Sequence, residues 1–288
     1  MRPGDISLLC IASASCYWPR ACNGNQVMQV IANALADIRA GLRMRDVWIA
    51  LAHEDIGDQH RRTALGPAWL LINYLAFAGT FLVIFGHDAR SPNYPAYVAI
   101  GLLVWFYMLD VINLSVTLFA REESFIKGTT LPLTVYILRL TAQSVMRAGY
   151  ALVGCLAILL LSQTAVTVTW AVAGAGLVLL VVATPAVVMI FATIGAFFPD
   201  LQFIVQNLMR LGMFLTPVFW VHTGDGGIRG AFYYWNPFTY FLEIVRVPVI
   251  AGDIPARSFL LCTVLTLVLW CLAILCLGRF RKQIVLVV

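Results

Sequence analysis

Long apolar runs follow one another along most of this chain, and they constrain its fold more than any other feature. They cover Leu65–Phe85, Tyr97–Ala120, Tyr136–Leu161, Val168–Phe198, Phe203–Val221 and Phe259–Leu277. An apolar run of about 20 residues is long enough to cross the hydrocarbon core of a bilayer as a helix. The pattern therefore predicts an all-α membrane protein with about six transmembrane helices. The fifth run is the weakest, because Gln206, Asn207 and Arg210 interrupt it.

The composition excludes a soluble globular domain. Hydrophobic residues make up 61% of the chain and charged residues 11%, whereas a soluble domain carries roughly 25% charged residues. The net charge is +5, but the basic residues flank the apolar runs and form no compact soluble face. This excludes a nucleic-acid-binding function and makes the membrane the expected environment.

Basic residues mark the two ends of the membrane domain. Those before the first run are Arg39, Arg43, Arg45, Arg61 and Arg62, and those after the last run are Arg279, Arg281 and Lys282. Because cytoplasmic loops are enriched in Lys and Arg, we expect both termini in the cytoplasm and the chain in the cell inner membrane. The predicted outer segment between the fifth and sixth runs departs from this bias, since it contains Arg229, Arg246 and Arg257.

The segments outside the spans define the remaining organisation. We expect an N-terminal tail over residues 1–36, an amphipathic interfacial helix over 37–62, the transmembrane domain over 63–282 and a cytoplasmic tail over 283–288. Within the transmembrane domain, the run Phe232–Ile250 is too short and too broken by prolines to span. It predicts short re-entrant or interfacial helices between spans five and six.

The first 27 residues or so admit three interpretations. Arg2 followed by Ile6–Ala14 resembles a signal peptide, and Ser13–Cys16 resembles a lipoprotein cleavage site. The alternatives are that translation starts at Met28 or that this stretch is a disordered tail.

The sequence lacks several signatures of catalysis and cofactor binding. There is no GxxxxGK[ST] loop, so ATP and Mg²⁺ are expected in a separate chain. His53, Glu54, Asp55, Asp58 and His60 are residue types that ligate metals, but they spread over several helical faces, and we expect a solvated face instead. No CxxC pair indicates a zinc site, and no paired carboxylates indicate an intramembrane transferase. We expect no catalytic residue, metal or cofactor in this chain.

Polar residues inside the apolar runs are candidates for function, because ionisable groups in a membrane are costly. Arg139, Gln143 and Arg147 lie at i, i+4 and i+8 in the third run. The same spacing recurs at Gln202, Gln206 and Arg210 in the fifth run, and Asp110 and Asn113 lie in the second. These stripes indicate a hydrated channel or a subunit contact. The alternative is that Arg139 extends to the cytoplasmic interface and the amides bond between helices.

Asp110 and Arg147 are expected to form an ion pair. The second and third runs are joined by the short loop Arg121–Thr130, so they should pack as an antiparallel hairpin. Asp110 lies about 11 residues before that loop and Arg147 about 17 after it, which at ~1.5 Å per residue brings them to similar depths. The alternative has Arg147 facing channel water and Asp110 bonded to Asn113 or across a dimer.

Aromatic side chains gather near the predicted outer ends of the spans. The principal candidates are Trp105, Phe106, Tyr107, Phe219, Trp220 and Trp235. An aromatic belt at the membrane interface is one explanation. A track on which sugar rings stack is the other, because sugars present apolar faces to aromatic rings.

Several motifs, in order along the chain, resemble those of the ABC-2 type polysaccharide export permeases, the Wzm family. They are the Thr63–Trp69 segment, the Ile100–Trp105 segment, Phe125–Lys127 followed by Leu131–Leu133 and Arg139, the Thr216–Trp220 segment, and Asn236–Phe238 followed by Glu243–Arg246 and Pro248. The resemblance covers roughly Asp46 to Lys282. The turn Phe197–Asp200 lacks the arginine that this family usually places before the aspartate.

The resemblance implies a homodimeric permease that works with two copies of a separate ATP-binding subunit. Its cargo would be a lipid-linked polysaccharide such as O-antigen, capsule or a cell-wall glycan. The inner loop would then contact the ATPase through Glu122, Glu123, Phe125 and Lys127. Arg61 and Arg62 would meet the anionic head group, or would act as a topology signal with lipid-phosphate contacts.

Three other functions are compatible with parts of the sequence. An exporter of a small lipid or drug from the same superfamily would share the spans but lack an aromatic lining. An intramembrane enzyme acting on polyprenyl lipids would need the acids that are missing. A scaffold without a transport role would not explain the arginines inside the spans.

Overall fold

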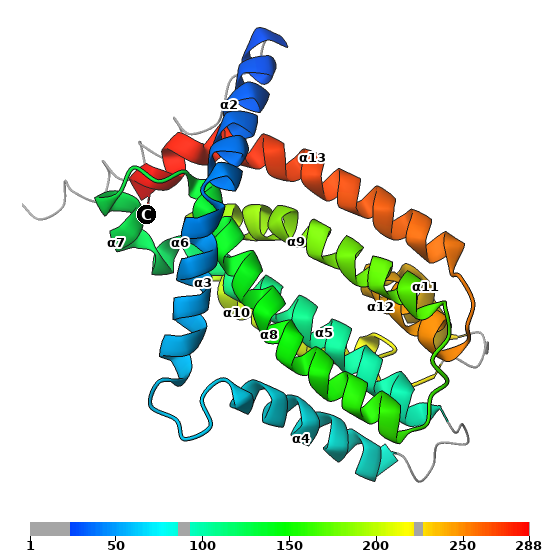
Figure 1. Ribbon diagram of the computed structural model, residues 1–288. Coiled ribbons are helices and arrows are strands. Elements are labelled where there is room, and N and C mark those ends of the chain that lie inside the picture. The colour runs from blue at the N-terminus through cyan, green and yellow to red at the C-terminus, as the bar shows by residue number, and fades with distance from the viewer. Residues whose placement is uncertain (1–23, 86–92, 222–226, 288) are drawn as a thin grey trace, which may run out of the picture.

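The computed structural model describes residues 24–85, 93–221 and 227–287, and every regular element in these segments is a helix (Figure 1). The helices are α2 (Gly24–Arg43), α3 (Arg45–His60), α4 (Ala68–Phe85), α5 (Tyr94–Val116), α6 (Leu118–Arg121), α7 (Glu123–Gly128), α8 (Leu133–Leu161), α9 (Trp170–Phe197), α10 (Leu201–Leu215), α11 (Ile228–Trp235), α12 (Pro237–Ile250) and α13 (Ala256–Val287). The all-helical fold class is confirmed. The signal-like motifs of the N-terminus lie outside the described residues.

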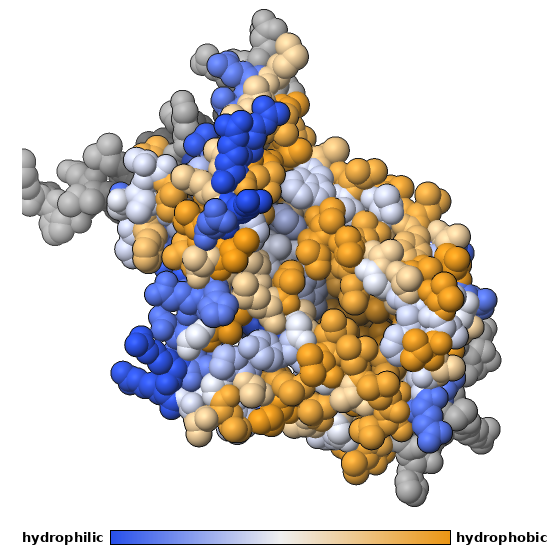
Figure 2. Space-filling view, in the orientation of Figure 1, coloured by the Kyte–Doolittle hydropathy of each residue, from blue (hydrophilic) through white to orange (hydrophobic). Residues whose placement is uncertain are grey.

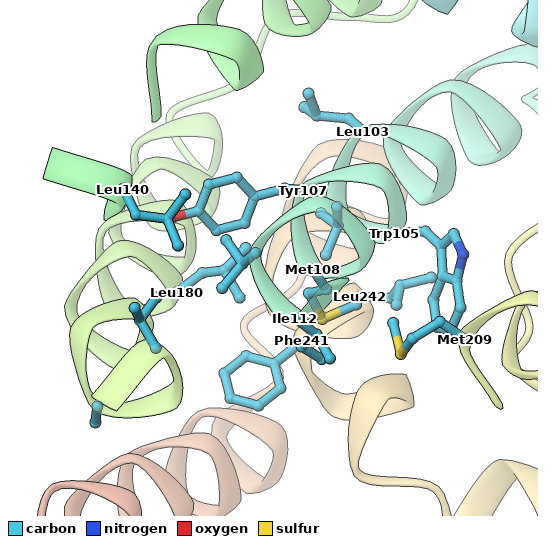
Figure 3. Close-up of a cluster of buried hydrophobic side chains, with 14 of the residues drawn as sticks. Leu103, Trp105, Tyr107, Met108, Ile112, Leu140, Leu180, Met209, Phe241 and Leu242 are labelled. Carbon is cyan, nitrogen blue, oxygen red and sulfur yellow. The ribbon is translucent and has the colours of Figure 1, made fainter. Parts of the chain in front are cut away.

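Helix α5 forms the centre of the bundle. It packs against α8, α9, α12, α10 and α4, and most of its side chains are buried. Figure 3 shows how Leu103, Tyr107 and Met108 of α5 pack with side chains from α8, α9, α10 and α12. The helix begins after Asn93, with Pro95 in its first turn, where a missing backbone N–H is tolerated. The predicted antiparallel packing of the second and third apolar runs corresponds to α5 and α8.

Among the described residues, four helices are long and apolar enough to cross a membrane: α5, α8, α9 and the first part of α13. The face of the molecule shown in Figure 2 is largely hydrophobic over the bundle, and hydrophilic side chains gather along α2 and α3. On α13, Leu260, Val264 and Leu267 are more than half exposed. A surface of this kind is suited to contact lipid chains. The chain is therefore a multi-pass membrane protein.

The first and fifth apolar runs give shorter helices than the sequence predicts. Helix α4 has 18 residues and α10 has 15. The fifth run extends to Val221, but α10 ends at Leu215 because Thr216 precedes Pro217 and adopts an extended backbone conformation. A residue before proline is disfavoured in the helical region. These two helices fall outside the four that meet the length and hydropathy expected of a span.

The N-terminal helices α2 and α3 run across one end of the bundle (Figure 1). The predicted interfacial helix was placed over 37–62, but helix α2 already begins at Gly24, and the chain bends at Met44 before α3. The predicted tail boundary at residue 36 thus falls inside α2. At the other end of the chain, α13 continues through Val287, so residues 283–287 are helical.

Helix α2 is held tightly against α8 and α13. The Asp37 carboxylate accepts hydrogen bonds from the backbone N–H (3.1 Å) and the hydroxyl (2.8 Å) of Thr134, in the first turn of α8. Arg281 of α13 lies 2.9 Å from the same carboxylate, whose side chain is fully buried. Gly278 allows a close approach as well, since a Cβ there would lie 2.3 Å from the carbonyl oxygen of Val30. We call this contact the α2 clasp.

Candidate functional site

An ion pair joins α5 and α8 inside the membrane domain. Arg147 donates through Nη1 to both carboxylate oxygens of Asp110, at 3.0 and 2.8 Å. Ser144 donates a longer hydrogen bond of 3.4 Å to the same carboxylate. The side chains of Arg147 and Asp110 are 14% and 31% exposed, so the pair is largely removed from solvent. The predicted Asp110–Arg147 pair is confirmed.

The pair borders a cavity of about 250 Å³ between α4, α5 and α8. Its polar lining comes from Asn73, Asp110, Ser144 and Arg147, and its apolar lining includes Phe77 and Phe106. A cavity of this size and polarity can hold water molecules. The charged pair therefore lies beside a cavity with room for water within the apolar bundle.

A second charged cluster lies nearer to the segment formed by α6 and α7, Leu118–Gly128, which we call the inner turn because the sequence predicts it on the inner side. Arg139 of α8 donates through Nε and Nη2 to the two carboxylate oxygens of Asp55 in α3, both at 2.6 Å. Its Nη1 donates to Glu122 at 2.9 Å, at the junction of α6 and α7. Gln143 also donates to Asp55 and accepts from Arg147 at 3.4 Å. The stripe Arg139, Gln143 and Arg147 is therefore one connected polar row on α8.

Asp55 was expected on the solvated face of the interfacial helix, and that expectation is wrong. Its side chain is 22% exposed and points towards α8. The reason is visible in the helical spacing, because Ala52 and Ile56, on the same face, are buried against the bundle. An acid between two buried apolar positions was the signal in the sequence that could have identified this contact.

The inner turn presents the other residues expected to contact an ATPase. Glu123 and Lys127 form an exposed ion pair at 2.6 Å, and the ring of Phe125 is 54% exposed. Glu122 differs from them, since its side chain is 9% exposed and turned towards Arg139. The four residues thus divide between a solvent-facing set and one buried acid.

Other charged candidates lie apart from these clusters. Arg61 and Arg62 are exposed at the corner between α3 and α4, and Arg61 lies 3.6 Å from Asp58. In α10, Arg210 and Asn207 are exposed and Gln206 is partly buried. No hydrogen bond or ion pair among the described residues joins Arg210 to the polar row on α8, because Arg210 is exposed on α10.

The aromatic candidates do not form one surface. Trp105 and Tyr107 are buried in the core, where Tyr107 shares a 2.7 Å hydrogen bond with Thr184. Phe106 instead contacts Phe77 of α4, with ring centroids 5.2 Å apart. Phe219 stacks on Phe81 at 5.0 Å.

The two remaining aromatic candidates, Trp220 and Trp235, lie towards α10 and α11. The Trp220 indole donates to the carbonyl of Phe214. Trp235, at the end of α11, is 87% exposed. Sequence reasoning missed Phe77 and Phe81 of α4, which connect the ring of Phe106 to that of Phe219.

A buried arginine that sequence reasoning left out of the site fastens the end of α10. Arg246 of α12 donates to the carbonyl oxygens of Pro217 (2.7 Å) and Val218 (3.0 Å) and lies 3.7 Å from the centre of the Tyr97 ring. Nearby, Glu243 of α12 accepts hydrogen bonds from Tyr233 and Ser258. Arg246 therefore holds the non-helical segment after α10 against α12, whereas Glu243 connects α12 to α11 and α13.

Comparison with known proteins gives one family. The ABC-2 type transporter model matches residues 47–250, a stretch that runs from α3 to the end of α12.

Individual relatives agree with that match. The O-antigen export system permease protein RfbA of Myxococcus xanthus is 25% identical over 185 residues, which are 63% of this chain and 70% of that protein. An RfbA of Klebsiella pneumoniae is 26% identical over 181 residues, covering 60% of this chain and 68% of that protein. The polysialic acid transport protein KpsM of Escherichia coli is 20% identical over 229 residues, or 75% and 86% of the two chains.

Proposed function

Because the chain belongs to the ABC-2 type transporter family, we propose that it is the membrane subunit of an ATP-driven exporter of lipid-linked polysaccharide. The observation that carries this proposal is the similarity to permeases named for O-antigen export and polysialic acid transport, which extends over 60–75% of the chain. An ion pair buried between the membrane helices α5 and α8 supports a transport role. Ionisable side chains are costly inside a membrane, and they are therefore candidates for function there.

The proposed topology has six spans with both termini in the cytoplasm. Helices α4 and α10 supply the two spans beyond the four long apolar helices, and α11 and α12 dip into the outer leaflet. With ~1.5 Å per residue, α10 is about 22 Å long, shorter than the roughly 30 Å hydrocarbon core. The non-helical segment that follows it can still lie at membrane depth, since Arg246 satisfies the carbonyls of Pro217 and Val218.

The proposed assembly is a homodimer whose second copy covers α10. Most apolar side chains of α10 are exposed in the single chain, including Phe203, Leu208 and Leu211 at about three-fifths each. Asn207 and Arg210 are exposed on the same helix. A lipid-facing helix would not favour these polar side chains, whereas a hydrated passage between two copies would accommodate them.

A separate subunit is proposed to bind ATP and Mg²⁺ and to contact the inner turn. Phe125 supplies an exposed aromatic ring there, with the Glu123–Lys127 pair beside it. An exposed ring flanked by charges is a common form of protein contact. Helices α6 and α7 would be the elements that such a subunit pushes.

Deleting the gene in its native host tests the proposed function. We expect lipid-linked glycan to accumulate in the cytoplasm and to disappear from the cell surface, as measured by lectin labelling of intact and opened cells. A plasmid copy should restore surface glycan. Normal surface glycan in the deletion strain, together with loss of a small exported lipid, would instead favour a small-lipid exporter.

A further inference from the structure

One side chain of α8 bonds to both α3 and the α6–α7 junction. Helix α3 packs mainly against α8, and α7 packs mainly against α6. Arg139 of α8 bonds to Asp55 of α3 and to Glu122 at the α6–α7 junction. The guanidinium therefore connects the interfacial helix with the inner turn.

The hydrogen bonds of this cluster couple its three side chains to one another. An arginine has a planar fork of donors, and here two donors fit the carboxylate of Asp55 while a third reaches Glu122. The side chains of Arg139 and Glu122 are 12% and 9% exposed. A displaced carboxylate would therefore leave a poorly solvated charge behind, so the three groups are expected to move together.

The location of Glu122 connects this cluster to the surface of the inner turn. Glu122 is the C-cap residue of α6 and also the N-cap residue of α7, so a tilt of α7 displaces it directly. Phe125 lies within the same short helix and is exposed. A force on the exposed side of α7 would therefore displace Glu122, and with it the guanidinium of Arg139.

We propose that Arg139 is a positioning residue that transmits movement of the inner turn to helix α3 through the Glu122–Arg139–Asp55 cluster. The proposal rests on the proposed function, because the movement would come from ATP binding in the partner subunit. Helix α3 would then change position when the partner subunit binds or releases ATP. Gln143 extends the same row from Asp55 towards the Asp110–Arg147 pair.

Glu122→Gln is the primary test, because it leaves the Arg139–Asp55 contact in place and should preserve the fold. Hydrogen–deuterium exchange would be measured on the complex with its ATP-binding subunit, without nucleotide and with ATP. In the wild type, ATP should change exchange in residues 118–128 and in residues 45–60. In Glu122→Gln the change at 118–128 should remain, whereas the change at 45–60 should be lost.

Transport per ATP hydrolysed gives an independent measurement in reconstituted vesicles. Glu122→Gln and Arg139→Lys should reduce it by about tenfold, while ATP hydrolysis continues. Asp46→Asn is the matched control. Asp46 lies on α3, as Asp55 does, but it forms an exposed pair with Arg45 and its side chain is 93% exposed. It should behave as the wild type in both measurements.

The outcomes separate the two proposals. If ATP still changes exchange at 45–60 in Glu122→Gln, or never changes it in the wild type, the Arg139 connection is refuted. If the wild-type complex shows the exchange changes but moves no glycan, the proposed cargo is wrong and the connection stands. If no ATP-binding subunit joins this chain, both proposals fail. Should Glu122→Gln not accumulate, Arg139→Lys, which keeps the charge, decides by the same exchange criterion.

Discussion

At the scale of single residues, the membrane domain depends on charges that are matched within it. Arg147 and Asp110 neutralise each other between α5 and α8, and Gln143 links them to the cluster around Arg139. A lone charge near the centre of a bilayer costs about 2.5–3.5 kcal/mol even on the lenient insertion scale. Each partner is therefore expected to depend on the other for its place in the bundle.

A charge exchange tests this dependence. Asp110→Arg and Arg147→Asp should each lower stability by about 3 kcal/mol, because a like-charged pair replaces a buried ion pair. The double variant should recover part of that loss. Thermal unfolding of the purified protein in detergent measures both effects, with Asp46→Asn as the control for a change of surface charge. A double variant no more stable than the weaker single variant would mean that the two residues do not act as a pair.

At the scale of helices, close approaches decide which elements stay together. A Cβ at Gly195 of α9 would lie 1.9 Å from the carbonyl oxygen of Val116, the last residue of α5. That contact involves backbone, which cannot yield as a flexible side chain can. The junction of α5, α6 and α9 thus requires a residue without a side chain at position 195.

Gly195→Ala should therefore separate α9 from α5 and lower stability by about 1–3 kcal/mol. Gly149→Ala is the matched control, since nothing lies within 4 Å of a Cβ at that position in α8. There the added methyl should stabilise the helix by about 0.5–1 kcal/mol. Detergent-based thermal melts would compare the two, and equal shifts in both variants would contradict the packing described.

The α2 clasp gives a second prediction at this scale. Asp37→Asn removes the charge that faces Arg281 and weakens the acceptor for Thr134 in the first turn of α8. We expect a loss of about 1–2 kcal/mol and faster amide exchange in residues 28–43. Arg39→Gln, an exposed change on the same helix, should leave exchange as it is. Unaltered exchange in Asp37→Asn would show that the buried carboxylate does not hold α2.

At the scale of the whole molecule, the sequence predicted where the long apolar helices lie and how deep their charged residues sit. It predicted less well which side chains these and other charged residues contact. Apolar runs located α5, α8, α9 and α13, since lipid contact imposes length and hydropathy on each helix separately. The Asp110–Arg147 pair followed from depth within one hairpin. Asp55 and Asp37 could not be placed in this way, because their partners on α8 are distant in sequence and are chosen by tertiary packing.

The proposed topology can be checked by labelling single cysteines in a background without the native ones. Val168, between α8 and α9, and Leu286, near the end of α13, are 92% and 84% exposed. With six spans and cytoplasmic termini, Val168→Cys should react with an impermeant maleimide added to intact cells. Leu286→Cys should react only after the cells are opened. Reaction of Leu286→Cys in intact cells would exclude this topology.

The arginine that fastens the end of α10 has a consequence for how the molecule can move. Because Arg246 donates hydrogen bonds to the carbonyls of Pro217 and Val218, the C-terminal end of α10 is tied to α12. The N-terminal end of α10, at Pro199 and Asp200, has no comparable anchor among the described contacts. The two ends of α10 are therefore held unequally, and any tilting of this helix should be largest at the end near Pro199 and Asp200, far from Arg246.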